Sequence, residues 1–228
     1  MAIYGKSVRH AGILFCAIAV LVIGFMAIVV GARSYILEEA PQAEITVPFS
    51  IEGTSLIAEK IVSYDGPFLE DGSGDEVFGV STLVVKNTGT TGVEHARITL
   101  VVDDGFLEFD INKLPAGATV AVLEKNRAKY RSYSLYRGYG EQSLLNEGWG
   151  DWPVLIEPYD LGSFLITNNT ENTLRNININ YKNYLPGIYV GGIAYHISYP
   201  FLQPGQSVVL YPEHYVSGYS TIVYISTQ

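Results

Sequence analysis

The stretch STLVVKNTG, residues 81–89, decides the expected fold, because an apolar run of branched residues ends in a turn that contains Asn and Gly. Branched residues favour β-strands, and Asn and Gly tolerate the positive φ that many tight turns need. Further along, the chain reads SFLITNNTEN, residues 163–172, with the same order of apolar run and Asn-rich turn. The second stretch therefore predicts a second copy of the same strand and turn.

The likeness between the two stretches continues beyond them. At an offset of 81 residues Asn87 aligns with Asn168, and the alternating apolar positions that follow also align: Val93, Ala96, Ile98 and Leu100 with Leu174, Ile177, Ile179 and Tyr181. An insertion of seven residues, YLPGIYV at 184–190, shifts the offset to 88, after which Gly117 aligns with Gly205. Apolar residues that alternate in this way are typical of half-buried strands.

This repeated order of strands and turns predicts an internal duplication. Short strands separated by turns, without helices between them, are typical of antiparallel β-sandwiches. We predict an all-β protein with two tandem Ig-like sandwiches, at residues 54–130 and 150–228, joined by an aromatic-rich linker at residues 131–149. The alternative is one larger sandwich built from two halves.

The repeated pattern also resembles a known kind of module. Leu83 to Gly89 reads L-x-V-x-N-x-G, and Leu114 to Val120 reads L-x-x-G-x-x-V. In this order the two motifs resemble the bacterial and archaeal Ig-like modules of the CARDB and NEW3 kind. In the second copy Thr170 replaces the turn glycine. The resemblance covers the repeated part of the chain, and it implies an adhesion, spacer or envelope-assembly domain without catalytic residues.

The N-terminal part predicts a membrane anchor. Residues 11–32, AGILFCAIAVLVIGFMAIVVGA, form an uncharged run of 22 residues, and about 20 such residues span a bilayer as a helix. Lys6 and Arg9 precede the run, so residues 1–10 are expected to be a cytoplasmic tail. Residues 33–53 are interpreted as a stalk. A cleaved signal peptide that ends at Val30-Gly31-Ala32 is the alternative.

The charge and the cysteine count limit the partners and the compartment. Once Lys6 and Arg9 are set aside, 12 basic and 23 acidic residues remain, a net charge of −11 that disfavours nucleic acid. Cys16, the one cysteine, lies in the predicted span, so the exported part has no disulfide. This usage indicates a Gram-positive or archaeal envelope, with a single-pass protein in the cell membrane and its bulk outside the cytoplasm.

One acidic loop, FLEDGSGDEVFG at residues 68–79, is a candidate calcium site. Calcium binds six to eight oxygen ligands, and alternate residues of a glycine-containing loop can direct oxygens inward. The candidate ligands are Asp71, Ser73, Asp75 and Glu76. A solvated acidic loop without a metal is the alternative.

The segment around the predicted linker is rich in Tyr, Arg and Trp. Exposed aromatic rings stack on sugars, and Tyr, Trp and Arg also anchor protein interfaces. The candidate interface or ligand residues are Tyr133, Tyr136, Arg137, Tyr139, Trp149 and Trp152. Packing of these aromatics between the two units is the alternative.

The sequence contains none of the short catalytic motifs H-E-x-x-H, G-x-S-x-G or the P-loop, so no enzyme activity is expected. We predict a structural or protein-interaction component of a cell-envelope or surface-appendage assembly, with a protein partner. A glycan-binding or adhesion module that uses the aromatic segment is the alternative. An accessory or sensor subunit that acts with another membrane protein is a third hypothesis.

Overall fold

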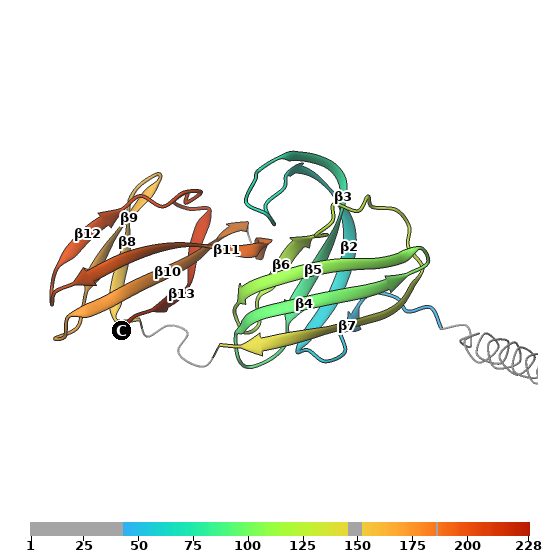
Figure 1. The fold of residues 1–228 in the computed structure, drawn as a ribbon, viewed down its shortest axis with the longest axis horizontal. Helices are drawn as coiled ribbons and strands as arrows, with labels where there is room; N and C mark the ends of the chain where they lie inside the picture. Colours follow the sequence, from blue (N-terminus) through green and yellow to red (C-terminus); the bar gives the residue numbers. More distant parts are fainter. Residues whose placement is uncertain (1–42, 146–151, 186) are drawn as a thin grey trace, which may run out of the picture. The chain divides into compact units, whose positions relative to one another are not determined.

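The computed structural model describes residues 43–145, 152–185 and 187–228, so the predicted anchor at residues 11–32 lies outside the described residues. Where the structure describes it, the chain is all-β with several sheets and no helix, as the sequence predicts (Figure 1). Residues 44–228 form one compact unit. Its strands are β1 (Phe49–Ser50), β2 (Leu56–Pro67), β3 (Glu76–Asn87), β4 (Val93–Val102), β5 (Gly105–Leu114), β6 (Thr119–Leu123), β7 (Leu135–Leu144), β8 (Val154–Asp160), β9 (Ser163–Asn168), β10 (Leu174–Leu185), β11 (Ile188–Leu202), β12 (Ser207–Leu210) and β13 (Ser220–Ser226).

The first half of the unit, residues 44–145, builds its core from two groups of antiparallel strands. Strand β3 pairs with β2 and β6, and strand β4 pairs with β5 and β7. The inward residues of β4 and β5 are fully buried together with Leu83 and Val85 of β3. Apolar residues at every second position therefore meet in one core, because alternate side chains of a strand point to the same face.

The second half, residues 152–228, repeats this arrangement. Strand β9 pairs with β8 and β12, and strand β10 pairs with β11 and β13. Its core contains Phe164 and Ile166 of β9 and the predicted inward residues Ile177, Ile179 and Tyr181 of β10. Each half thus has its own hydrophobic core, and strands at the predicted offsets of 81 and 88 residues hold equivalent places.

The buried asparagines of the two halves explain why the same turn recurs. Asn87 is fully buried; its Nδ2 donates to the carbonyl oxygens of Thr91 and Pro115, 3.0 and 3.1 Å away, and its Oδ1 accepts from Gly89 N. Asn168 is equally buried, and its Nδ2 donates to the carbonyls of Asn172 and Leu202 at 2.8 and 3.0 Å. In both halves one amide side chain ties the end of a strand to two later turns.

Strand β7 lies within residues 131–149, the segment that the sequence suggested to be a linker. It pairs with β4 along its whole length. Its inner face offers no apolar alternation, because Gly138 stands where the Phe49 ring packs: a Cβ on Gly138 would lie 2.3 Å from that ring. The close approach requires glycine and removes the periodic signal that would have indicated a strand.

The insertion at residues 184–190 joins the two halves. It lengthens the β10–β11 hairpin, and Tyr189 and Val190 of β11 pair in parallel with Val120 and Ala121 of β6. As a result β1, β2, β3, β6, β11, β10 and β13 form one seven-stranded sheet. The seven residues that break the repeat are thus the residues that connect its copies.

Candidate functional site

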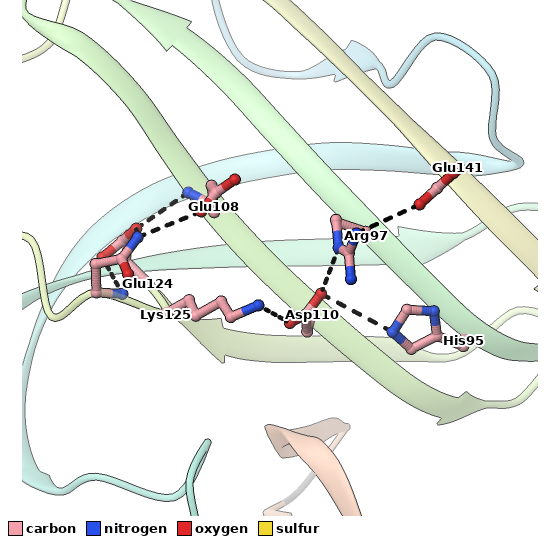
Figure 2. Close-up of polar contacts among 8 residues, drawn as sticks. His95, Arg97, Glu108, Asp110, Glu124, Lys125 and Glu141 are labelled. Atoms are coloured by element: carbon pink, nitrogen blue, oxygen red, sulfur yellow. Dashed lines mark hydrogen bonds and ion pairs between the residues drawn. The ribbon is translucent and has the colours of Figure 1, made fainter.

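The strands β5, β4 and β7 present a polar outer face, which we call the charged face (Figure 2). Because Ala96 and Ile98 of β4 point into the core, His95 and Arg97 point outward. The pairing register places Arg97 opposite both Asp110 of β5 and Glu141 of β7. The face is therefore made of cross-strand rows, in which side chains opposite one another interact.

Asp110 is the centre of the charges on this face. Its Oδ2 lies 2.9 Å from Lys125 Nζ, and its Oδ1 lies 3.5 Å from Arg97 Nε and 3.9 Å from His95 Nε2. Arg97 Nη1 also lies 3.6 Å from Glu141 Oε1. These side chains are 30 to 77% exposed, and exposed ion pairs contribute only about 0–1 kcal/mol each. Such groups exchange partners at little cost, which suits a binding surface.

A buried carboxylate holds Lys125 beside Asp110. Glu124 is 1% exposed; its Oε2 accepts hydrogen bonds from Asn126 N and Ala128 N, both at 2.8 Å. Its Oε1 accepts from Glu108 N at 3.1 Å, so the turn after β6 is fixed to β5 (Figure 2). The charged face is therefore partly preorganised, because the backbone that carries Lys125 is held in place.

An aromatic and arginine pair extends the charged face along β7. The Arg137 guanidinium lies 5.2 Å above the Tyr139 ring, and it binds Glu52 Oε2 at 2.9 and 2.5 Å through Nε and Nη2. The hydrogen bonds that Arg137 donates to the Glu52 carboxylate raise the pKa of Arg137, so the group stays charged. A shallow hollow of about 280 Å³ lies beside Tyr139, lined also by Arg97, Thr99, Gly140 and Glu141. This part of the face combines a cation, an aromatic ring and polar groups around one recess.

The other aromatic residues predicted from the sequence lie elsewhere. The Tyr133 hydroxyl donates to Lys129 O at 2.5 Å and lies 2.9 Å from Ser81 Oγ, while its ring packs against the first core. Tyr136 is half-buried on β7, and Trp152 packs against the second core. Trp149 lies outside the described residues. Of the predicted set, the structure thus brings Arg137 and Tyr139 together on the charged face.

Two carboxylates of the acidic loop predicted to bind calcium form ion pairs with one arginine. Arg127 Nη2 lies 2.8 Å from Asp71 Oδ2 and 3.0 Å from Asp75 Oδ2. Hydrogen bonds from Ser73, the hydroxyl first, and from Arg127 lower the pKa of Asp71 to about 2. Glu76 begins β3 and is exposed. Across the described ranges no group of three or more His, Cys, Asp or Glu residues is arranged to hold a metal, and the calcium site stays a prediction.

Two charged residues at the junction of the halves, the fully buried Lys182 and the half-buried Glu70, were not recognised as a pair in the sequence. Glu70 Oε1 accepts from Leu123 N at 2.7 Å and its Oε2 from Gly192 N at 2.6 Å. Lys182 Nζ donates to the carbonyls of Ile193, Gly192 and Asn112 at 2.6, 3.2 and 3.2 Å. Burial raises the pKa of Glu70 to about 7 and lowers that of Lys182 to about 7.

One feature of the sequence could have indicated the pair of Glu70 and Lys182. Lys182 follows Tyr181 in the alternating stretch of β10, at a position whose counterpart at an offset of 81 is Val101. A lysine in place of valine within a repeat marks a changed environment, because lysine is almost never fully buried without partners. Lys182 is nevertheless fully buried, since the first half covers it.

Comparison of the chain with protein-family models and with curated proteins finds no match. Within residues 43–145, 152–185 and 187–228 there is no helix long and apolar enough to cross a membrane.

Proposed function

We propose that the chain is a membrane-anchored, extracytoplasmic protein with tandem Ig-like sandwiches of the CARDB and NEW3 kind. It works as a structural or protein-interaction component of a cell-envelope or surface-appendage assembly. The uncharged run at residues 11–32 supports the anchor, and the two hydrophobic cores support the tandem arrangement. A non-catalytic role fits the charged face, where Arg97, Asp110 and Glu141 form partly exposed ion pairs.

The charged face is the observation that carries this proposal. Arg and Tyr are enriched in the residues that dominate binding energy at protein interfaces. Here Arg137 and Tyr139 lie beside Arg97, and Phe106 on the neighbouring strand β5 is 65% exposed. Mixed charges around exposed aromatic rings favour a protein partner with a complementary charge pattern.

Photo-crosslinking in native membranes tests the protein-interaction role. A photoreactive residue at Tyr139 of the full chain should yield an adduct with one protein, and Arg97→Ala should reduce that adduct by about tenfold or more. Tyr224 is the matched control, because it pairs with Asn180 of β10 as Tyr139 pairs with Thr99 of β4. Equal adducts from both positions, or none from Tyr139, would reject the charged face as an interface.

Glycan binding is the alternative, and the hollow beside Tyr139 favours it. Sugar rings stack on exposed tyrosines, and Thr99, Arg97 and Glu141 supply hydrogen-bonding groups around the recess. A purified polysaccharide from the envelope, titrated against the full chain, should then bind the wild type and lose affinity in the Tyr139→Ala variant. Binding that is unchanged in this variant would reject the glycan role of the face.

The anchor is tested separately from the face. Alkaline carbonate treatment should leave the full chain in the membrane pellet, and protease added outside intact cells should digest residues after 33. Release into the supernatant would instead support the cleaved signal peptide.

A further inference from the structure

The two halves differ in how the edges of equivalent sheets are covered. In the first half, β6 has β3 on one side and residues 189–190 of β11 on the other. Its equivalent in the second half is β12, since Val208 pairs with Ile166 as Val120 pairs with Val85. Among the described strands, β12 pairs only with β9, so its other edge has no strand beside it.

The residue at the end of each strand differs in exposure as well. Leu123 at the end of β6 is 4% exposed because it packs with Phe68, Val77 and Val80, whereas its counterpart Tyr211, directly after β12, is 68% exposed. An uncovered edge offers backbone N–H and C=O groups for pairing with another chain. The equivalent strands thus differ: among the described strands, β6 is paired along both edges, whereas β12 is paired along one.

The two outer edges of the second-half sheet are not equally open to pairing. Edge strand β8 contains Pro158 between Glu157 and Tyr159, and it ends at Asp160. Proline and charged residues are devices that prevent strand addition at an edge. Strand β12 reads Ser-Val-Val-Leu, without charge or proline. Of the two edge strands of the β12-β9-β8 sheet, β12 is therefore the one without proline or charge.

We propose that β12 is a docking strand for an extended segment of a partner protein, which adds in parallel as residues 189–190 add to β6. The residues of β11 that pair with β6 indicate which residue types the partner segment would contain. They belong to the uncharged, branched and aromatic triplet Ile188-Tyr189-Val190, followed by Gly191 and Gly192. Glycine is required there, because a Cβ on Gly192 would lie 1.9 Å from Asp110 O of the first half.

The β11 extension of a second copy is not the occupant, because it already pairs with the β6 of that copy. The equivalent hairpin of the first half, β4–β5, turns at Asp103 and Asp104, and Arg131 binds both carboxylates at 3.3 and 2.5 Å. That hairpin has no inserted apolar strand to donate. The strand comes from another protein, which specifies the partner class for the interaction role proposed above.

A peptide with the sequence of residues 187–195, GIYVGGIAY, serves as the probe. The fluorescent peptide is titrated against the full chain in detergent micelles, and amide hydrogen exchange locates the site. We expect saturable binding and slower exchange at residues 207–210. Val209→Lys should weaken binding about tenfold or more, because a lysine on an edge strand opposes pairing, whereas Leu155→Lys on β8 should leave it unchanged.

Two isomeric peptides distinguish strand addition from adsorption. One carries N-methyl groups at Ile188 and Val190, and the other at Tyr189 and Gly191. Alternate N–H groups of a strand point to opposite edges, so one isomer should lose about tenfold or more in affinity while the other binds as before. Equal binding of both isomers, the absence of saturation, or protection at residues 119–123 in place of 207–210 would overturn the proposal. Such a failure leaves the crosslinking result at Tyr139 unaffected, so the two proposals fail separately.

Discussion

The outer face of β4 in the first half carries Arg97, whereas the same position of β10 in the second half carries Asn178. Around them the row Glu141, Arg97 and Asp110 becomes Ser226, Asn178 and Ser198. Ser198 Oγ donates to Asn178 Oδ1 at 2.6 Å, so the row remains a set of cross-strand polar contacts without charge. The two halves thus share a register and differ in the chemistry that they present.

The inner positions of the two halves differ far less. Both bury an asparagine at the end of the equivalent strands β3 and β9, and both bury apolar residues at the aligned positions of β4 and β10. Packing and hydrogen bonds within the core limit what an inner position accepts, because a buried polar group without a partner is costly. Outer positions are free of this constraint, so one duplicated fold provides a charged face and a neutral one.

The largest expected effect comes from the junction that makes the halves unequal. Lys182→Met leaves three carbonyl groups without their donor and removes the amine beside the half-buried Glu70. We expect the free energy of unfolding at pH 8 to fall by about 3 kcal/mol or more in guanidinium titrations, because each buried carbonyl left without a donor costs about 1–3 kcal/mol. The Glu70→Gln/Lys182→Met variant is the control and should recover part of this loss. A loss below about 1 kcal/mol would contradict the role of the pair.

The same junction should give the chain an unusual pH dependence. Between 4.5, the ordinary pKa of a glutamate, and about 7, folded Glu70 retains a proton that the unfolded chain has lost, so stability falls as pH rises. Between about 7 and 10.5 the unfolded chain holds the extra proton on Lys182, so stability rises with pH. We expect the difference between wild type and the Glu70→Gln/Lys182→Met variant to pass through a minimum near pH 7. A difference that does not change with pH would refute this assignment.

The buried asparagines test how similar the two halves are. Asn87→Ala and Asn168→Ala each remove an amide that several backbone groups contact. We expect each variant to lose about 1–3 kcal/mol in urea titrations, because buried carbonyls lose their donor. If the two losses differ by more than about 2 kcal/mol, the equivalent turns contribute unequally to the free energy of unfolding.

The smallest expected effect on stability is at the charged face. Arg97→Ala breaks ion pairs with Asp110 and Glu141 that are partly exposed. We expect a loss below about 1 kcal/mol that decreases further with added salt, measured by thermal unfolding. Asn178→Ala in the second half is the matched control and should show no salt dependence. A large loss for Arg97→Ala would indicate a structural role in place of a binding one.

Local residue patterns were enough to predict the all-β class and the equivalence of the two halves. Asn87 and Asn168 marked the repeated turn, and the alternation from 96 to 100 marked a strand, because both depend on neighbours in the chain. Strand β7 was missed because Gly138 and Gly140 face neighbouring groups closely and leave no apolar periodicity. Tyr139 and Arg137 were recognised as candidate interface residues by their type. That they lie close to Arg97 and Glu141 could not be predicted, because this proximity depends on the pairing of β7 with β4.

The sequence by itself determined the duplication, the β content, the uncharged N-terminal run and the position of the insertion, since each is a property of residue order. The tertiary structure decided what the insertion does: it pairs β11 with β6, buries Lys182 near Glu70 and leaves β12 without an equivalent cover. These outcomes join residues far apart in the chain, as with Tyr189 and Val120 or with Glu70 and Gly192. Their energies depend on burial and on the loss of water around charges, which no local pattern of residues records.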